Sequence, residues 1–356
     1  MKTGSKLSGI QKQGLTVVIP TYNGATWLPE TLAHIQASIK EAKLNTYEIV
    51  IINDGSSDNT VGVVEDLIRK ADYPMRLVTQ KNGGRFVARR TGTNEAKYPF
   101  ILFVDTRVFI GKSSLKYVIK QNQKDDSRAV WCSHVRVDTK GNIYARFWET
   151  VAFVAWRKYF RRPKDTSYGI KQFDDYPKGT TCFLIKKDIL KDANEWFERN
   201  TKDLKTSNDD TLLLRYIAQT NSINISPDFW CLYHARSAFK QYVKHVFHRG
   251  KVFVDGFLRN DGNRFFIPLI GFLALSVLVP ISLIISPQFI LPALVALLAG
   301  WLLELSIFLA IGVPYKDALS AVWLTPVFAV YYGAGIWRAF LKIYVLKNTR
   351  KATDAQ

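Results

Sequence analysis

Two short apolar runs on either side of one helical segment constrain the fold of this chain most strongly. The runs are residues 15–19 and 49–52, and residues 27–43 between them read as a helix. Two β-branched runs around one helix predict a βαβ unit. Ligands of such units bind past the carboxyl ends of the strands, where the chain has residues 20–23 and 53–56. The glycine fingerprints of dinucleotide and P-loop sites are absent from the sequence, so this pocket needs another explanation.

The charge of the chain is strongly positive and unevenly distributed. It has 49 Lys and Arg against 30 Asp and Glu, a formal net charge of +19. Such an excess favours a polyanionic partner, which would be nucleic acid, an anionic membrane surface or a phosphorylated substrate. Charges almost vanish from Phe265 onward, and nucleic acid alone would not require this hydrophobic tail. Residues 1–14 lack the apolar core of a signal peptide, so we expect the first domain in the cytoplasm.

Two further features follow the βαβ unit and suit a bound diphosphate. Gly83 and Gly84 lead into a basic helix start, where backbone amides, the helix N-terminus and guanidinium groups favour phosphate oxygens. The alternative is a turn with a solvated basic face. The apolar run 100–104 ends at Asp105, a single carboxylate that could hold a divalent cation bridging diphosphate oxygens. The alternative role for Asp105 is a helix cap.

Four blocks in order, PTYNG, IINDGSSDNT, KNGGRFVARRTGTNEA and FILFVDTR, resemble the nucleotide-binding half of family 2 glycosyltransferases of the GT-A fold. The resemblance covers roughly residues 15–110. It implies that a nucleotide-sugar donor is bound, with one set of residues at its base and ribose: Pro20, Thr21, Tyr22, Asn23 and Asp54. It also implies a second set beside the phosphates, Gly83, Gly84 and Arg89, with Asp105 at the first position of the D-x-D block. Arg85 and Arg107 are further positive charges of this chain that we expect near the diphosphate.

The chain departs from the family pattern at two positions. Asn53 replaces the first carboxylate of the D-D-G-S block, a mild change because an amide still hydrogen-bonds a base edge. The D-x-D block reads Asp105-Thr106-Arg107, so a metal loses one carboxylate ligand. The fixed charge of Arg107 could itself neutralise part of the diphosphate. We therefore expect Mg²⁺ or Mn²⁺ at Asp105, with a weaker or relaxed metal requirement.

An adjacent pair of carboxylates, Asp209 and Asp210, opens a helical segment after the strand-like block 178–185. In the family this spacing places the catalytic base. The chemistry requires one, because an acceptor hydroxyl is a poor nucleophile until a carboxylate takes its proton. Asp210 matches the aspartate of the family's E-D pair and is the predicted base, with Asp209 at the glutamate position. The alternative is an N-terminal pair that complements the helix dipole.

Two segments suggest contact with a membrane or a lipid acceptor. Residues 144–160 are rich in aromatic side chains and arginine, with Trp148 and Trp156 among them, although a core helix would have a similar composition. Residues 236–259 read as an amphipathic basic helix that includes Arg249, and the alternative is a helix that only packs against the domain. The Q-x-x-R-W motif of the family's processive members is absent from this region, which disfavours polymer synthesis.

The apolar tail has the length for two or three membrane spans. Residues 265–285 and 289–311 each supply the required 20 or so apolar residues and form a hairpin. Residues 318–345 are a third candidate, interrupted by Pro326, two glycines and Arg338. Three spans would leave the basic C-terminus outside, against the positive-inside tendency. The third segment therefore either violates this tendency or is re-entrant or interfacial, and its length favours three spans slightly.

Together these features predict an α/β protein with a GT-A, Rossmann-like mixed sheet. We expect a basic tail at 1–14, a cytoplasmic catalytic domain at 15–235, an interfacial helix at 236–262, a transmembrane region at 263–346 and a tail at 347–356. The expected activity is inverting transfer of a sugar from a nucleotide sugar, uridine-linked by the resemblance, to a lipid phosphate or lipid-linked saccharide at the inner membrane. The rival is a non-catalytic, membrane-tethered binder of sugar nucleotides or polysaccharide.

Overall fold

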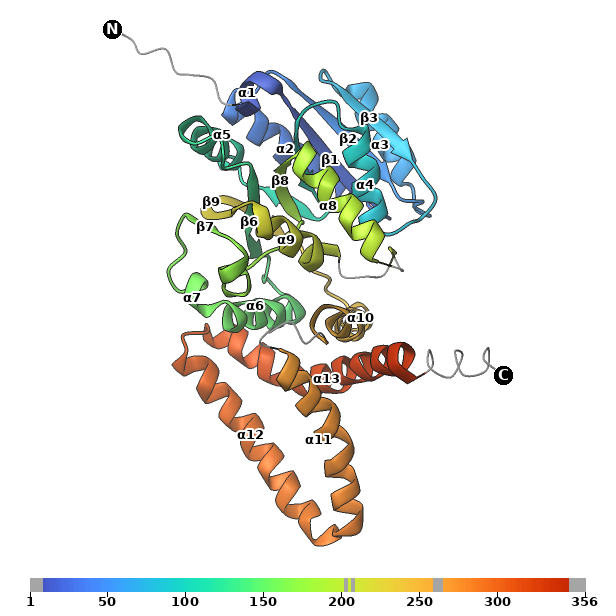
Figure 1. The fold of residues 1–356 in the computed structure, drawn as a ribbon, viewed down its shortest axis with the longest axis vertical. Coiled ribbons are helices and arrows are strands. Elements are labelled where there is room, and N and C mark those ends of the chain that lie inside the picture. Colours follow the sequence, from blue (N-terminus) through green and yellow to red (C-terminus); the bar gives the residue numbers. More distant parts are fainter. Residues whose placement is uncertain (1–8, 202–203, 206–208, 259–264, 346–356) are drawn as a thin grey trace. The chain divides into compact units, whose positions relative to one another are not determined.

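The computed structural model describes residues 9–201, 204–205, 209–258 and 265–345 (Figure 1). The chain divides into two compact units. The sheet unit comprises residues 1–138 and 156–235, and the helical unit comprises residues 139–155 and 236–356. This division differs from the boundaries expected from the sequence, because residues 139–155 belong with the C-terminal part of the chain.

A nine-stranded mixed sheet organises the sheet unit, in the order β3-β2-β1-β4-β8-β6-β9-β5, with β7 paired to β9. The strands are β1 Leu15–Thr21, β2 Tyr47–Asn53, β3 Met75–Thr79, β4 Phe100–Val104, β5 Val108–Ile110, β6 Val130–Val137, β7 Thr166–Tyr168, β8 Cys182–Lys186 and β9 Ile223–Tyr233. Strands β3, β2, β1 and β4 are parallel, whereas β8 runs antiparallel to β4. The carboxyl ends of β1, β2 and β4 therefore lie at one edge, as the βαβ pattern predicts.

Helices cover both faces of this sheet and define two apolar cores. The helices are α1 Gly9–Gln13, α2 Leu28–Ala42, α3 Thr60–Lys70, α4 Arg85–Glu95, α5 Ser114–Lys124, α7 Arg157–Phe160, α8 Lys187–Asn200, α9 Asp209–Thr220 and the 3₁₀ helix η1 Ile170–Asp175. Side chains alternate along β1, so Val17 packs with α2 and α5 in one core while Val18 packs with α4, α8 and α9 in the other. Each face of the sheet is thus sealed by its own helices.

Two local features of the sheet unit matter for the site or for the expected boundaries. Gly92 lets α4 lie close to β1, because a Cβ at this position would be 2.3 Å from Cγ1 of Val18. This close approach packs the second half of α4 against the middle of β1. Helix α1 lies within the segment expected to be a tail, and its Ile10 is fully buried in the core. Residues 9–14 therefore belong to the folded unit.

The helical unit contains α6 Ile143–Ala155, α10 Phe239–Phe257, α11 Phe266–Ile285, α12 Ile290–Ala310 and α13 Tyr315–Phe340, with short helical turns η2 Pro287–Phe289 and η3 Leu341–Val345. The segment expected at 144–160 is interrupted after Ala155, and α7 belongs to the other unit. Three helices are long and apolar enough to cross a membrane: Phe266–Ile285, Pro287–Ala310 and Tyr315–Ile343. The expected interfacial helix corresponds to α10, and residues 259–262 lie outside the described residues.

Candidate active site

Asp105 stands at the carboxyl end of β4, where the antiparallel neighbour β8 begins. Its backbone N–H donates to the carbonyl of Thr181 over 2.9 Å, which fixes the residue just past the strand. Both of its carboxylate oxygens accept from Nη2 of Arg89, at 2.9 and 3.1 Å. The strand end predicted to present a carboxylate therefore does so, and an arginine of α4 holds it.

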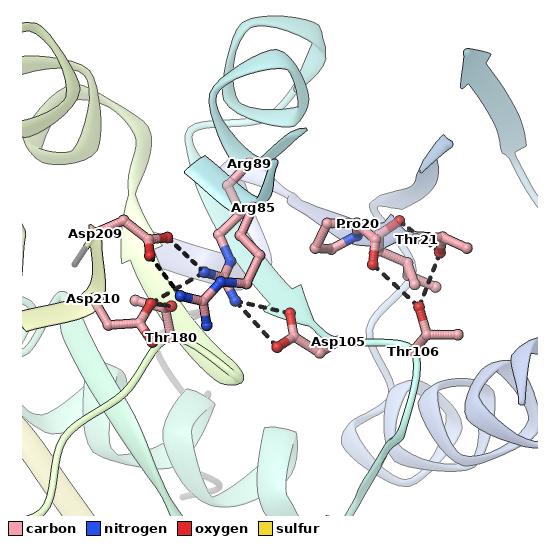
Figure 2. Close-up of polar contacts among 10 residues, drawn as sticks. Pro20, Thr21, Arg85, Arg89, Asp105, Thr106, Thr180, Asp209 and Asp210 are labelled. Carbon is pink, nitrogen blue, oxygen red and sulfur yellow. Dashed lines mark hydrogen bonds and ion pairs between the residues drawn. The ribbon is translucent and has the colours of Figure 1, made fainter. Parts of the chain in front are cut away.

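Arg89 joins this carboxylate to the acidic pair at the start of α9 (Figure 2). Its Nη1 donates over 3.1 Å to Oδ2 of Asp209 and over 3.1 Å to Oδ1 of Asp210. One guanidinium thus binds three carboxylates from two separate elements, and its side chain is only 9 % exposed. Residues far apart in the sequence are brought to one point by an arginine that reaches from the sheet-facing side of α4.

The three carboxylates differ in their access to solvent. The side chains of Asp105 and Asp210 are each 29 % exposed, whereas that of Asp209 is 3 % exposed. A group that receives a proton from a substrate must be reachable by it. Asp210 meets this requirement and Asp209 does not, and the role of Asp210 as the base remains a prediction.

Burial and the ion pairs oppose each other in the electrostatics of the cluster. Burial raises the pKa of Asp209 and of Asp105, and the nearby charge of Asp210 raises both further, while Arg89 and Arg85 act in the opposite direction. Burial alone would lower the pKa of Arg89, but its three carboxylates outweigh that effect and raise it. Arg85 donates to Oδ1 of Asp209 over 3.2 Å, and its pKa is also raised, chiefly by Asp209. Three carboxylates against two guanidiniums leave a site of net negative charge when all are ionised.

Thr180 is a member of this cluster that the sequence reasoning did not single out. Its hydroxyl donates to Oδ1 of Asp210, the oxygen that also accepts from Arg89. Thr180 lies two residues before β8, and the β4–β8 register pairs Val104 with Cys182. The sequence shows a hydroxyl just before this strand. Its place at the site could be predicted only from the pairing of β8 with β4, because β8 starts where β4 ends.

Asp54 accepts hydrogen bonds from the glycine loop that precedes α4. Its Oδ1 accepts from the backbone N–H of Gly83 over 2.8 Å, and its Oδ2 accepts from that of Gly84 over 2.9 Å. The side chain of Gln80 donates to the same carboxylate over 2.7 Å. The two glycine amides, which the sequence suggested for a diphosphate, therefore have Asp54 as their partner here. Their contact with phosphates remains a prediction, and the observed geometry makes Asp54 the residue that sets the start of α4.

The segment after β1 is bound to its two neighbouring strand ends. Asn23 adopts a left-handed conformation, with φ of 52°, which asparagine tolerates better than most residues. Its side-chain oxygen accepts from the N–H of Ser57 over 2.8 Å. On the other side, the hydroxyl of Thr106 donates to the carbonyl of Pro20 over 3.1 Å and lies 3.0 Å from that of Thr21 (Figure 2). These contacts hold the edge together and leave Tyr22 exposed.

The metal-ligand chemistry of the site is sparse. Within the described residues no group of three or more His, Cys, Asp or Glu could hold a metal ion. Arg89 lies between the three carboxylates, and Arg107 stands where the D-x-D pattern has its second carboxylate. The guanidinium of Arg107 lies 5.3 Å from the ring of Trp27. Both carboxylate oxygens of Asp105 accept from Arg89, and the role of Asp105 as a metal ligand remains a prediction.

The residues predicted to meet the acceptor or the membrane fall into different units. In the helical unit the guanidinium of Arg249 lies 5.2 Å from the ring of Trp148, a cation–π contact between α10 and α6. Trp156 belongs to the sheet unit, where the ammonium of Lys178 lies 5.9 Å from its ring. The role of all three residues in acceptor or membrane contact remains a prediction.

Comparison with known proteins finds similar sequences and folds. A family model described as "Glycosyl transferase family 2" matches residues 16–193, half of the chain. A poly-β-1,6-N-acetyl-D-glucosamine synthase of Staphylococcus epidermidis is 24 % identical over 198 residues, which cover 55 % of this chain and 45 % of that protein. The synthase of the same name from Staphylococcus aureus is 24 % identical over 196 residues, with the same coverage. The alignments therefore span less than half the length of these relatives.

A solved structure shares the fold over most of the chain. It is the mannosyltransferase PcManGT from Pyrobaculum calidifontis in complex with GDP-Man and Mn²⁺, with a TM-score of 0.56 and 19 % sequence identity. The match covers 92 % of this chain and 87 % of that one. The predicted α/β, GT-A mixed-sheet fold with an apolar helical region is confirmed.

Proposed function

We propose that this chain, which belongs to glycosyl transferase family 2, transfers one sugar with inversion from a nucleoside diphosphate sugar to a membrane lipid. The observation that carries the proposal is the Arg89 cluster. It joins Asp105, at the end of the donor-binding strand, to Asp210, at the start of α9. A solvent-reachable carboxylate beside the predicted diphosphate position is the arrangement that a single in-line displacement needs.

Asp210 is the proposed general base. The acceptor hydroxyl gives its proton to the carboxylate of Asp210 while its oxygen attacks the anomeric carbon of the sugar. The bond between that carbon and the diphosphate oxygen breaks, and the nucleoside diphosphate departs with the electron pair. Thr180 and Arg89 both bind Oδ1 of Asp210, so they hold the carboxylate in one orientation. If the acceptor is a lipid phosphate, which is already anionic, this base contributes little.

Positive charge at the donor side is the second part of the proposed mechanism. The leaving diphosphate accumulates negative charge, and fixed cations near its oxygens lower the barrier. Arg107 and Arg85 are the proposed contributors, with Arg89 holding Asp105 in place. Asp105 would hold a divalent cation, which would supply further charge neutralisation to the diphosphate. The structural neighbour was solved with Mn²⁺, which supports a cation in the same role here.

The proposed donor is a uridine diphosphate sugar, and a guanosine diphosphate sugar is its direct competitor. The family resemblance supports the first, while the neighbour of known structure was solved with GDP-Man. The proposed acceptor is a lipid phosphate or lipid-linked saccharide in the inner membrane. Three apolar helices and a basic amphipathic helix on the same chain support it. Transfer of one sugar is proposed, although the curated relatives are named as synthases of a polymer.

A second candidate function is binding without catalysis. Arg107 in place of a carboxylate, together with Arg89 bonded to all three acidic side chains, favours a donor or glycan binder. Such a protein would bind sugar nucleotides and leave them intact.

The proposal is tested with the full chain in lipid nanodiscs, given radiolabelled UDP- and GDP-sugars and a lipid extract. Thermal-shift measurements first identify the donor that binds. We then expect the label to move into the lipid fraction and to stay in the nucleotide fraction when lipid is omitted. Binding of a donor without consumption, with every extract tried, would support the binder and contradict the transferase. The length of the labelled product separates single transfer from polymer synthesis.

A further inference from the structure

Helices α11 and α12 form an apolar hairpin whose length matches a bilayer. They contain 20 and 21 residues, which at 1.5 Å per residue give about 30 Å each, close to the thickness of the hydrocarbon core. Their connection, η2 with Ser286, carries no charge. Towards this turn the apolar side chains are widely exposed, with Ile285 at 75 % and Leu291 at 70 %. This surface requires a hydrocarbon environment, so the hairpin suits two complete crossings.

Helix α13 contacts this hairpin in a way that a third span would not. Its first half bonds to α12, where the indole N–H of Trp301 donates to the carbonyl of Val322 over 2.7 Å. Its second half bonds to α11, where the indole N–H of Trp337 donates to the hydroxyl of Ser276 over 3.0 Å. An antiparallel third span would instead continue along α12 towards Leu291. Trp301 and Ser276 lie near the middles of α12 and α11, so α13 crosses both helices between their middles and the ends away from the turn (Figure 1).

The opposite side of α13 is packed against charged helices. A Cβ on Gly250 of α10 would lie 2.1 Å from the carbonyl oxygen of Tyr332, and one on Gly335 would lie 2.3 Å from that of Phe247. The backbones of α10 and α13 are therefore in contact near these residues. Helix α10 is strongly basic, with Lys240, Lys244, His245, His248, Arg249 and Lys251. Further along, Arg146 of α6 forms a 3.1 Å ion pair with Asp317.

These contacts decide between the two arrangements that the sequence leaves open for the third apolar segment. If α13 crossed the membrane, the basic α10 would be drawn into the hydrocarbon with it. Each Lys or Arg at the centre costs about 2.5 to 3.5 kcal/mol on insertion scales. If α13 lies along the membrane surface, α10 stays at the level of the headgroups, where anionic lipids attract it.

Aromatic and basic residues fit the second arrangement. Trp323 and Trp337 lie on α13, whereas residues 277–300 contain neither Trp nor Tyr. Tryptophan concentrates at the membrane–water interface. The basic residues after α13 would then stay on the same side as α10, in agreement with the positive-inside tendency.

We propose that α13 lies parallel to the membrane surface beneath α6 and α10, and that the α11–α12 hairpin alone crosses the bilayer. The anionic headgroup layer is the partner of the basic α10. Residues 1–258 and the C-terminus then stay on one side, and the turn at Gln288 reaches the other. This inference rests on the membrane location in the proposed function and adds its topology.

Single introduced cysteines test the topology in the full chain. The three native cysteines are buried and give a low background. Gln288→Cys and Gln356→Cys are expressed separately and treated with a membrane-impermeant maleimide in intact cells and after lysis. We expect Gln288→Cys to react in intact cells and Gln356→Cys to react only after lysis. Reaction of Gln356→Cys in intact cells would establish three spans and overturn the inference. Protection of Gln288→Cys in intact cells with reaction after lysis would also overturn it, because the hairpin would not cross.

A pair of lysine substitutions gives a second measurement that does not depend on labelling. Val330 lies near the middle of α13 and is 67 % exposed, and Leu275 lies near the middle of α11 and is 59 % exposed. We expect Val330→Lys to leave the amount of membrane-inserted protein within about twofold of the wild type, because the ammonium reaches the headgroups. Leu275→Lys should lower it by tenfold or more. Equal losses would place both helices at the same depth. Neither measurement needs turnover, so a chain with this topology but no sugar transfer would refute only the proposed function.

Discussion

The sheet unit and the helical unit differ in which side chains they bury and which they expose. The sheet unit gathers three carboxylates around one buried guanidinium at the ends of β4 and α9. The helical unit contains the strongly basic helix α10 and leaves the apolar faces of α11 and α12 exposed. In water a buried charge must be paired, and in a bilayer an apolar surface needs no cover. The difference shows which solvent each part of the chain is built for, and each prediction below challenges one side of it.

Removal of the central cation of the sheet unit should have the largest effect on stability. Arg89→Ala leaves three clustered carboxylates with a reduced counter-charge, so we expect a loss of about 3 to 5 kcal/mol and no sugar transfer. Thermal unfolding and the transfer assay measure both. The control is Arg90→Ala on the same helix, whose pair with Glu198 is about one-third exposed and should cost about 1 kcal/mol or less. Similar losses of stability in the two variants would mean that the buried Arg89 cluster stabilises the fold no more than an exposed ion pair does.

A bulky residue at the helix crossing tests the other unit. Gly335→Leu places a side chain against the backbone of α10, and we expect a loss of about 1 to 3 kcal/mol from overpacking. The loss of helical signal on heating in detergent measures it, while donor binding should not change. Gly300→Leu is the matched control, since a Cβ there meets no described atom within 4 Å. A Gly335→Leu variant as stable as the control would contradict the close contact of α10 and α13.

One carboxyl of the helical unit should make stability depend on pH. Burial, with a smaller contribution from the nearby Asp317, raises the pKa of Glu149 from 4.5 to about 7. The folded unit therefore holds this proton more tightly than the unfolded chain, and it loses stability as the pH rises from about 4.5 to about 7. At pH 8 we expect Glu149→Gln to increase the free energy of unfolding by about 1 to 2 kcal/mol, seen as a higher unfolding temperature. Below pH 4.5 the substitution should change the unfolding temperature little. Glu65→Gln, at an exposed position of the sheet unit, should show no such pH dependence. An equal response in this variant would mean that the effect comes from the change in net charge and not from burial of Glu149.

Metal removal should have the smallest effect. Because Arg107 supplies a fixed charge where the family has a carboxylate, EDTA should lower turnover less than about tenfold, or about 1.4 kcal/mol in the barrier. Arg107→Asp restores the D-x-D pattern and should make turnover strongly dependent on Mg²⁺ or Mn²⁺. Complete dependence of the wild type on one metal would show that Arg107 does not replace it.

Much of the sheet unit could be predicted from local pattern. Apolar runs that stop at Thr21, Asn53 and Asp105 mark parallel strands whose carboxyl ends share one edge, and the structure has them there. The partners of those residues could not be predicted in the same way. Thr180 reaches Asp210 because β8 runs antiparallel to β4, a pairing across about 80 residues that no local period records. The bonds from Asp54 to the glycine amides likewise depend on how the two loops meet.

The helical unit shows the opposite balance between composition and arrangement. The length and apolarity of α11, α12 and α13 were plain in the sequence and agree with the helices found. The orientation of α13 was not, because hydropathy reports how apolar a helix is and not which neighbours touch it. The contact of Gly250 with Gly335, from which we infer the orientation of α13, joins residues 85 positions apart. The assignment of α6 to this unit has the same cause, since its partners lie in α10 and α13.

The most direct test of the account is the transfer activity of Asp210→Asn. The substitution keeps the size of the side chain and removes the proton-accepting charge. With a hydroxyl acceptor we expect the turnover number to fall by about 10² to 10⁴, with the donor dissociation constant within about threefold of the wild type. Asp126→Asn, the same change at an exposed position of the sheet unit, should leave both unchanged. Transfer by Asp210→Asn at the wild-type rate would contradict the proposal that the Arg89 cluster presents the catalytic base.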